Sequence, residues 1–407
     1  MNCRTCGSSD LEQFLDLGFT PPADRFLRAE QLLEPEVHYP LAVLMCAQCG
    51  LAQLNYVVAP ELLYQQDYPY EASITRTGRI HWGEFAKTTR ERFDLGSADL
   101  VIDIGSNVGV LLDAFKNEGV RTLGIEPAGN IAAIARNNGI ETLNDFFSID
   151  VARSVVNDKG QASVITATNV FAHVDDLMSF IKAVDILLAP NGVLIIEAPY
   201  FTNLLEQLEY DTIYHEHLSY LSVKPLLAFF RRVGMEVFKI EQRDIHGGSF
   251  RIHVARAGRM QISSEVGELL QLEETKAVHS LEKLDQFAKK VEKNRDDLNW
   301  LLYSLKREGK RIAAASAPAK GMTLLNYCRL GTETIDFVTE KSTLKIGKYT
   351  PGTHIPVVPD EHLIERRPDY ALLLAWNFAD EIINNLAAYR AKGGKFIIPI
   401  PEPRIVE

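Results

Sequence analysis

The sequence predicts an α/β protein built around a doubly wound parallel sheet, with a small cysteine-rich domain before it and a second α/β unit after it. Three observations carry this prediction. Short apolar runs alternate with amphipathic stretches from residue 100 to 198 and again from 311 to 400. A glycine turn, Gly105 to Gly109, follows the first of these apolar runs. Two Cys-x-x-Cys pairs lie near the N-terminus.

The composition and charge of the chain exclude several classes of protein. A length of 407 residues predicts two or three domains. A net charge of −11 and the lack of a dense Lys/Arg run argue against a nucleic-acid surface. No apolar stretch approaches the roughly 18 residues of a membrane helix, and the first residues lack the apolar core of a signal peptide. We therefore expect a cytoplasmic protein without nucleic-acid or membrane partners, whose five cysteines are not disulfides.

The four N-terminal cysteines have the spacing of a structural zinc site. They form two Cys-x-x-Cys pairs, each followed by a glycine that lets backbone amides turn toward the thiolates. Four thiolates make a closed tetrahedral site with no open position for chemistry. The alternatives are two redox-active pairs or a chance arrangement. We predict a zinc-binding domain over residues 1–75 whose ligands are Cys3, Cys6, Cys46 and Cys49.

The central region begins with a strand, a tight glycine turn and a helix. An apolar run ends at Asp103 and Gly105, and an amphipathic run follows Gly109. The dinucleotide fingerprint needs glycines at its first, third and sixth positions, but the third is Asn107 and the sixth is valine. The next apolar run ends at Glu126, 21 residues after Gly105, where a carboxylate can accept two ribose hydroxyls. This indicates a nucleotide-like cofactor; the alternative is a βαβ unit whose glycines merely turn the chain.

The rest of the central region continues the alternation of strands and helices. The expected helices are 130–138 and 177–188, and the expected strands are 162–168 and 192–198, with a weak strand at 142. His173 follows the strand that ends at Thr168, and a histidine in that position faces the ligand crevice. A surface histidine beside acidic residues would explain His173 equally well.

A segment dense in ionisable and polar side chains follows, from Tyr210 to His217. A histidine oriented by a carboxylate can act as a general base, and a tyrosine hydroxyl can donate to a developing oxyanion. Tyr214, Glu216 and His217 provide these groups. Metal binding is disfavoured because His215 and His217 lie two positions apart and do not share a helix face.

Three further features allow both a functional and a structural explanation. Tyr64, Tyr68 and Tyr70 either pack at a domain junction or line a pocket. His246, before two glycines, lies either against a ligand or in a hairpin turn. Lys320, in a loop of small residues, either meets a phosphate at a helix N-terminus or belongs to a plain βα turn.

The C-terminal third divides into a helical segment and a second α/β unit. From residue 263 to 305 the apolar residues recur at three- and four-residue spacing, which predicts a helical bridge with a solvated charged face. Apolar runs at 311–315, 335–338, 370–376 and 396–400 predict buried strands. The predicted boundaries are 76–260 for the central domain, 261–305 for the bridge and 306–407 for the C-terminal α/β domain.

Together these motifs resemble the nucleotide-sugar C-methyltransferases of deoxysugar pathways. The resemblance covers essentially the whole chain, and its most specific parts are Asp67 to Tyr70, Tyr214 to His217 and Pro368 to Asn377. The Asp-x-Gly-x-x-x-Gly turn is similar to motif I of class I S-adenosylmethionine (SAM) methyltransferases. The resemblance therefore implies a Rossmann-like class I SAM methyltransferase core, between the zinc-binding domain and a C-terminal α/β domain that covers a nucleotide-sugar.

The resemblance also implies roles for individual residues. His217 is the implied base, supported by Glu216 and Tyr214, while His173 and Tyr70 line the sugar. The implied substrate-binding residues are Tyr68, His246 and Lys320. The implied SAM-binding residues are Asp103, Gly105, Asn107, Gly109, Glu126, Pro127, Asp145, Phe146 and Asn169.

The implied reaction is methylation at C-3 of a nucleoside-diphosphate (NDP) 4-keto-6-deoxysugar, with dTDP or GDP as the leading nucleotides. The 4-keto group acidifies the C-3 proton, a base removes it, and the carbanion attacks the SAM methyl group in line. The chain departs from the family pattern at Ser106 and Val108, which replace a cysteine and an aspartate. It departs again at His215, which replaces an acidic residue and brings a second imidazole near the base.

Two other functions stay open on the sequence alone. An O- or N-methyltransferase acting on a sugar or related metabolite would also need a base, and Glu216 and His217 would serve it equally. The other is a zinc-stabilised binding protein with an inactive methyltransferase core, which the intact motif glycines and histidines argue against. The glycine spacing disfavours a nicotinamide oxidoreductase.

Overall fold

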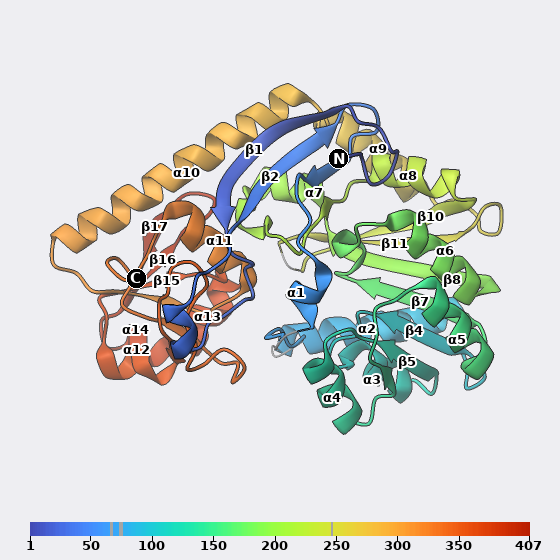
Figure 1. Cartoon of the computed structure of the whole chain (residues 1–407), viewed down its shortest axis with the longest axis horizontal. Helices are drawn as coiled ribbons and strands as arrows, with labels where there is room; N and C mark the ends of the chain where they lie inside the picture. The colour runs from blue at the N-terminus through green and yellow to red at the C-terminus, as the bar shows by residue number, and fades with distance from the viewer. Residues whose placement is uncertain (66–67, 73–75, 246) are drawn as a thin grey trace.

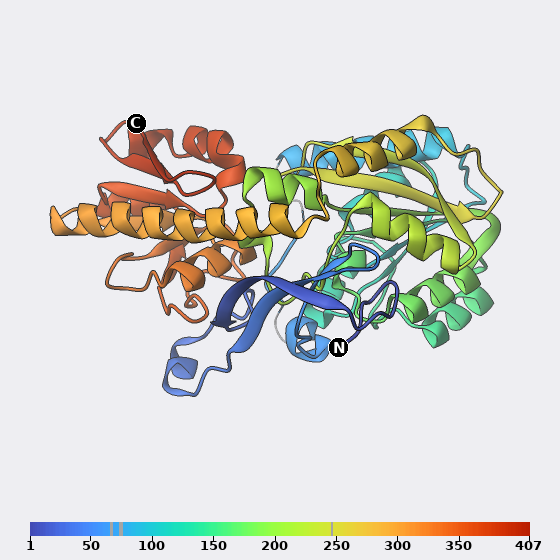
Figure 2. The ribbon, with the colours of Figure 1, turned by 90° about the horizontal axis from the view of Figure 1, so that it is seen from above.

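The computed structural model describes residues 1–65, 68–72, 76–245 and 247–407. Two α/β units lie side by side, and a long helix, α10 (Leu281–Arg307), extends from one to the other (Figures 1 and 2). The first strands of the chain lie next to this helix, between the two units. The N-terminal segment can therefore contribute side chains to the space where the two units meet.

The N-terminal sheet is antiparallel and takes its last strand from a distant part of the chain. Its strands, in spatial order, are β1 (Leu11–Thr20), β2 (Tyr39–Cys46), β3 (Ala52–Leu54) and β9 (Ser219–Tyr220). The helical turns of this segment are η1 (Ala29–Leu33) and α1 (Pro60–Tyr64). Because Tyr220 pairs with Ala52, the residues just after His217 are fixed to the N-terminal sheet.

The central sheet has seven strands in the order β10-β11-β8-β7-β4-β5-β6. The bounds are β4 (Leu100–Ile104), β5 (Arg121–Ile125), β6 (Thr142–Leu143), β7 (Ala162–Thr168), β8 (Leu188–Pro199), β10 (Met235–Arg243) and β11 (Ser249–Arg256). Strands β6, β5, β4, β7 and β8 run parallel, and β11 is antiparallel to both of its neighbours. Every residue of β4 is buried, as expected for a strand covered on both faces.

The helices of the central unit connect these strands. They are α2 (Arg76–Arg92), α3 (Val110–Asn117), α4 (Gly129–Asn137), α5 (Ile149–Lys159), η2 (Phe171–His173), α6 (Leu177–Leu187), α7 (Phe201–Gln207), η3 (Tyr210–Thr212) and α8 (Val223–Arg232). The strand order reverses between β4 and β7, and ligands of doubly wound sheets bind outside the carboxyl ends of the strands at such a point. Gly105 and Asn169 lie in the loops that follow β4 and β7.

The C-terminal unit is a second doubly wound sheet, in the order β14-β13-β12-β15-β16-β17. Its strands are β12 (Ile312–Ala315), β13 (Val338–Glu340), β14 (Val357–Pro359), β15 (Tyr370–Leu373), β16 (Lys395–Ile398) and β17 (Arg404–Val406). Its helices are α11 (Ala319–Cys328), α12 (Glu361–Arg366), η4 (Trp376–Phe378), α13 (Ala379–Asn385) and α14 (Ala387–Arg390). The sheet is parallel except for β17, and Lys320 lies in the first turn of α11, just after β12.

Two helices connect the units, α9 (Ser264–Thr275) and α10. The buried residues of α10 recur every three or four positions, so one stripe packs inward while the charged face stays in solvent. Asn294 lies in this stripe: its amide donates to the carbonyl oxygens of Pro399 and Pro401 and accepts the Tyr210 hydroxyl. This one side chain therefore joins the bridge to both α/β units.

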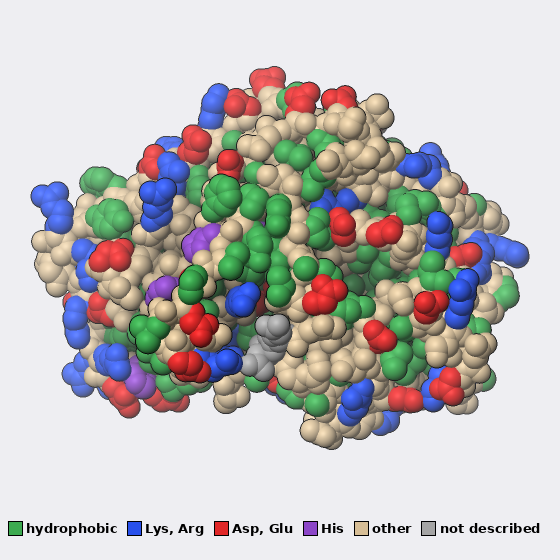
Figure 3. All heavy atoms as spheres, in the orientation of Figure 1, with side chains coloured by type: hydrophobic (Ala, Val, Ile, Leu, Met, Phe, Trp, Pro, Cys, Tyr) green, Lys and Arg blue, Asp and Glu red, His purple; other side chains and the backbone are tan. Residues whose placement is uncertain are grey.

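The surface shows no gathering of one charge on the face drawn in Figure 3, where basic and acidic side chains are interspersed. None of the helices in the described part of the chain is both long and apolar enough to span a membrane.

Candidate active site

The four N-terminal cysteines lie together in the folded chain. Their Sγ atoms are all within 4.8 Å of one another, and the Cys3–Cys49 and Cys6–Cys46 pairs are each 3.5 Å apart. Four sulfurs placed tetrahedrally at about 2.3 Å from a zinc ion would be about 3.8 Å from one another. The donor set and its dimensions therefore fit a structural zinc ion that is held entirely by the protein.

The glycine turn after β4 is closed tightly against its neighbours. Gly105 has φ +66°, and a Cβ added there would lie 2.4 Å from Cγ2 of Val170. Gly109 has φ +81°, and its Cβ would lie 2.8 Å from Cγ2 of Ile140. Both the left-handed backbone and the close approach require glycine at these positions.

Two buried carboxyl groups lie at the base of this turn. Asp103 accepts the Thr166 hydroxyl at 2.6 Å, and burial raises the pKa of Asp103 to about 7. Glu126 follows β5 and accepts the backbone amides of Asn107 and Ala128 at 2.9 and 2.8 Å. Each carboxylate oxygen of Glu126 has a second lone pair, so the group can still accept hydroxyls of a ribose. Burial raises the pKa of Glu126 as well.

The loop after β6 is tied to the loop after β5. Asn144 donates through Nδ2 to the carbonyl oxygens of Glu126 and Pro127, at 2.8 and 3.0 Å. Asp145 accepts the amide of Phe146 at 2.8 Å. The predicted Pro127, Asp145 and Phe146 are thus brought to one edge of the sheet. Asn144, which arranges them, was missed because an Asn beside an Asp carries no signal of its own.

Side-chain hydrogen bonds hold residues 68–72 across the glycine turn. Asn107 donates to the carbonyl of Tyr70 at 3.0 Å and accepts the amide of Ala72 at 2.8 Å. Asn130 donates to the carbonyl of Tyr68 at 2.9 Å. The side chain of Asn107, predicted to contact the cofactor, is therefore occupied in holding the tyrosine segment beside the cofactor loop.

Two histidines and two tyrosines form the centre of the candidate site. The ring centroids of His217 and His173 are 5.0 Å apart, and those of His217 and Tyr214 are 4.0 Å apart. The Tyr64 hydroxyl lies 3.2 Å from Nδ1 of His173, with the two rings stacked at 9°. Burial, and then the proximity of His217, hold the pKa of His173 well below its ordinary value. His173 is thus a neutral imidazole near pH 7.

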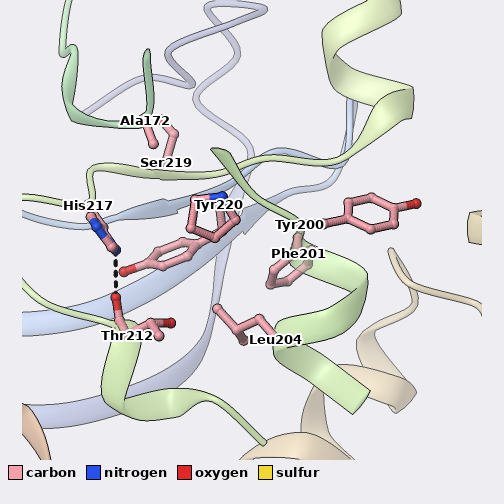
Figure 4. A pocket seen from close by; sticks show the side chains of 9 residues that line it. Ala172, Tyr200, Phe201, Leu204, Thr212, His217, Ser219 and Tyr220 are labelled. Carbon is pink, nitrogen blue, oxygen red and sulfur yellow. Dashed lines mark hydrogen bonds between the residues drawn. The ribbon is translucent and has the colours of Figure 1, made fainter. Parts of the chain in front are cut away.

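His217 is oriented from behind by a backbone carbonyl. Its Nδ1 lies 2.8 Å from the carbonyl oxygen of Thr212, in the turn that precedes it (Figure 4). A carbonyl oxygen only accepts, so Nδ1 carries the hydrogen and the lone pair of the neutral ring is on Nε2. A cavity of about 10 Å³ lies beside this contact, lined by His217, Ser219 and Tyr220 among others. That volume fits about one water molecule.

Glu216 belongs to a buried cluster that three parts of the chain build. It accepts the Tyr68 hydroxyl at 2.9 Å. Burial, and then the charge of Asp24, raise the pKa of Glu216 well above its ordinary value, which favours its protonated form. Lys345 lies 3.3 Å from Asp24, and both side chains are 6% exposed. Asp24 and Lys345 were missed because each is one charged residue in a loop, brought to Glu216 only by the tertiary fold.

Lys320, His215 and His246 are the remaining residues that the sequence singled out. Lys320 lies 3.9 Å from Oδ2 of Asp211 and 4.4 Å over the ring of Trp376, so its charge is compensated at the junction of the two units. His215 meets Tyr39 of β2 edge-on, and burial lowers the pKa of His215 to about 4. His246, like Asp67, lies outside the described residues.

Asn169 joins the cofactor loops to the buried end of β8. Its φ is +56°, and its amide donates to the carbonyl of Glu197 at 2.7 Å. The Glu197 side chain is 1% exposed and pairs with Arg251 at 2.7 Å and with His81 at 2.5 Å. These three side chains, of which Glu197 and Arg251 are buried, fix the end of β8 next to the crevice. Sequence reasoning missed them because the three residues are far apart in the chain.

The arrangement combines a base with a hydrogen-bond donor at the mouth of a nucleotide-type crevice. His217 presents a lone pair on Nε2, whereas Nε2 of His173 is shielded from solvent and has no hydrogen-bond partner among the described residues. A base and a hydrogen-bond donor a few ångströms apart can remove a proton from carbon and stabilise the oxygen that becomes negative.

Comparisons with known proteins support and extend this description. Residues 3–64 match the family described as "Putative zinc binding domain", residues 81–240 match "Methyltransferase domain", and residues 244–401 match "C-methyltransferase C-terminal domain". The C-methyltransferase NovU of Streptomyces niveus is 36% identical over 405 residues, which span 99% of this chain and 96% of NovU. The chain belongs to the C-methyltransferase family.

Other matches cover less of the molecule. A ubiquinone biosynthesis O-methyltransferase of Bordetella bronchiseptica is 30% identical over 98 residues, 24% of this chain and 41% of that enzyme. A solved SAM-dependent methyltransferase of Clostridium acetobutylicum is 15% identical, with a TM-score of 0.35 over 44% of this chain and 91% of its own.

The family membership confirms the main expectations from the sequence. The protein is a SAM-dependent C-methyltransferase with a Rossmann-like core, an N-terminal zinc-binding domain and a C-terminal domain. SAM fits the crevice at β4 and β5, where the glycine turn leaves no room for a Cβ and Glu126 lies at the strand end. Zinc fits the four cysteines.

Proposed function

We propose that this C-methyltransferase methylates C-3 of an NDP-4-keto-6-deoxysugar, with dTDP or GDP as the nucleotide, after removing the C-3 proton. The observation that supports this most strongly is that His217 and His173 lie together, with ring centroids 5.0 Å apart, at the carboxyl edge of the methyltransferase sheet. A carbon next to a carbonyl group becomes a nucleophile as its enolate, so methylation at C-3 of a 4-ketosugar needs both a base and a group that stabilises the developing oxyanion.

In this proposal each side chain of the cluster has one task. Nε2 of His217 takes the C-3 proton, while the Thr212 carbonyl keeps the ring in the required tautomer and stabilises the imidazolium that forms. His173 and Tyr70 face the C-4 oxygen. Tyr214 packs against His217 at 4.0 Å between centroids and limits its rotation. Bound SAM supplies the electrophilic methyl group.

Glu216 acts in the proposal as a neutral acid rather than as a carboxylate partner of the base. Its raised pKa, caused first by burial and then by Asp24, is consistent with this role. Tyr68 donates to it, so the carboxyl group positions the tyrosine segment that borders the sugar.

In the proposal each domain of the chain has a separate role. Residues 1–75 bind zinc and supply the tyrosine segment, 76–260 bind SAM and the sugar, 261–305 connect the units, and 306–407 cover the nucleotide. Lys320, already near Asp211, is the proposed cation nearest to the diphosphate. His246 remains a proposed substrate contact on the basis of the family resemblance alone.

Product analysis tests the proposal. The enzyme is incubated with SAM that carries a ¹³C-methyl group and with a dTDP- or GDP-4-keto-6-deoxyhexose, and the product is examined by NMR. We expect the labelled methyl to be bonded to C-3, with loss of the C-3 proton signal. A methyl group on oxygen or nitrogen would refute the proposed site of transfer.

A further inference from the structure

The two central histidines are held from behind by groups of opposite hydrogen-bonding character. Behind His217 is the carbonyl of Thr212, which can only accept. Behind His173 is the Tyr64 hydroxyl, 3.2 Å from Nδ1, which can donate. The group behind a neutral imidazole determines which nitrogen carries its hydrogen. The carbonyl favours a hydrogen on Nδ1 of His217, whereas a donating hydroxyl favours a hydrogen on Nε2 of His173, although the two rings face the same site.

The direction of the Tyr64–His173 hydrogen bond follows from the donor and acceptor strengths of the two groups. If Nδ1 of His173 donated to the Tyr64 oxygen, the phenolic hydrogen would need another acceptor. Among the described residues, Nδ1 is the one hydrogen-bond partner of the Tyr64 hydroxyl. A phenol O–H is a stronger hydrogen-bond donor than an imidazole N–H, and an imidazole nitrogen is a stronger acceptor than a phenol oxygen, so the hydroxyl donates to Nδ1. Burial, and then Glu216, raise the pKa of Tyr64 well above its ordinary value, so the phenol keeps its hydrogen.

Nε2 of His173 then carries the hydrogen of the ring. This atom is shielded from solvent and has no partner among the described residues. A buried N–H without an acceptor is a rare and costly arrangement in a folded protein, and it persists where a ligand supplies the acceptor. The neighbouring His217 ring, 5.0 Å away between centroids, presents the lone pair that removes the proton.

We propose that Tyr64 is a positioning residue that fixes His173 as the Nε2–H tautomer, and so makes it the hydrogen-bond donor to the substrate oxygen that becomes negative. This rests on the proposed function for its chemical meaning, because the acceptor is taken to be the C-4 oxygen. The tautomer itself is a property of the resting enzyme.

The first test therefore needs no substrate. Long-range ¹H–¹⁵N NMR on protein labelled with ¹⁵N-histidine shows which nitrogen of each neutral ring is protonated, and His173→Gln assigns the signal. In the wild type we expect His173 to be protonated at Nε2 and His217 at Nδ1. In Tyr64→Phe, which keeps the stacked ring, the His173 signals should move toward an average of both tautomers. A His173 ring protonated at Nδ1 in the wild type would overturn the proposal.

The second test separates positioning from a purely structural role. Tyr64→Phe should lower the turnover number roughly 3- to 10-fold, as expected for the loss of one hydrogen bond, without changing KM. His173→Gln retains an N–H donor whose direction does not depend on Tyr64, so adding Tyr64→Phe to it should cost nothing further. Tyr303→Phe, on the exposed face of α10, is the matched control and should leave turnover unchanged.

The two proposals fail in different ways. Equal, additive losses from Tyr64→Phe in both backgrounds would show that Tyr64 acts only through packing, and would overturn the positioning role. If the NMR shows the expected tautomers but no labelled methyl appears on C-3, the tautomer assignment stands and the proposed reaction is wrong.

Discussion

Replacing Arg251 by methionine should destabilise the methyltransferase core strongly. The guanidinium is 3% exposed, contacts Oε2 of Glu197 at 2.7 and 2.8 Å, and lies 3.5 Å over the ring of Phe85. His81 contacts the other oxygen of Glu197 at 2.5 Å. Although burial alone would raise it, the pKa of Glu197 is lowered because His81 and Arg251 stabilise its charge.

The expected loss of stability follows from the buried carboxylate that Arg251→Met leaves without its main partner. Glu197, itself 1% exposed, would keep a buried carboxylate with His81 as its remaining partner. Breaking a buried pair by removing one partner costs about 3–5 kcal/mol. Replacing both charged groups is much less costly, so Arg251→Met combined with Glu197→Gln should recover about half of the loss or more.

Chemical denaturation followed by circular dichroism measures these differences, with Arg243→Met as the matched control. Arg243 lies on the neighbouring strand, and its side chain is 35% exposed, so its loss should cost below about 1 kcal/mol. A loss below about 1 kcal/mol for Arg251→Met, or additive losses in the double variant, would refute the reasoning.

Three further predictions concern zinc, SAM and pH. Cys46→Ser should abolish stoichiometric zinc, measured by atomic emission, whereas Cys328→Ala should retain it; full zinc content in Cys46→Ser would contradict the four-cysteine site. Gly105→Ala forces a Cβ to within 2.4 Å of Val170 at φ +66° and should weaken SAM binding at least about tenfold by calorimetry, while Gly83→Ala, with open space around its Cβ, should not. His215 is buried, and its pKa is lowered from 6.5 to about 4. Its contribution to the stability of the folded protein is therefore fully present above pH 6.5 and is lost as pH falls toward 4. The unfolding free energy of wild type relative to His215→Gln should therefore fall by on the order of 3 kcal/mol between pH 7 and pH 4; a difference independent of pH would show that His215 is not buried as a neutral ring.

The sequence predicted the parts of the fold that local patterns determine. The strands at β4, β7 and β12 were found as short runs rich in apolar residues, which is the pattern of strands covered on both faces. The pairing of β3 with β9 was not predicted, because β9 has two residues and its partner is more than 160 positions away in the chain. No periodicity marks such a contact.

The candidate site was predicted to a similar extent. His173 and His217 were singled out separately and lie together, because both follow strands or turns at the carboxyl edge of the sheet. The packing of His215 against Tyr39 of β2 was not predicted, because the two residues are more than 170 positions apart in the chain. Asp24 and Lys345 reach Glu216 from the N-terminal and C-terminal domains, and only the assembled fold brings their charges together.

The central claim is that this enzyme makes a carbanion at C-3 and that His217 is the base. The most direct measurement is proton exchange: the enzyme is incubated in D₂O with a dTDP- or GDP-4-keto-6-deoxyhexose and S-adenosylhomocysteine, and C-3 deuteration is followed by mass spectrometry. The account predicts enzyme-dependent exchange that falls by about 10² to 10⁴ in His217→Ala while SAM affinity is kept. Exchange at the wild-type rate in His217→Ala, or labelled methyl transfer to C-3 without any exchange, would contradict it.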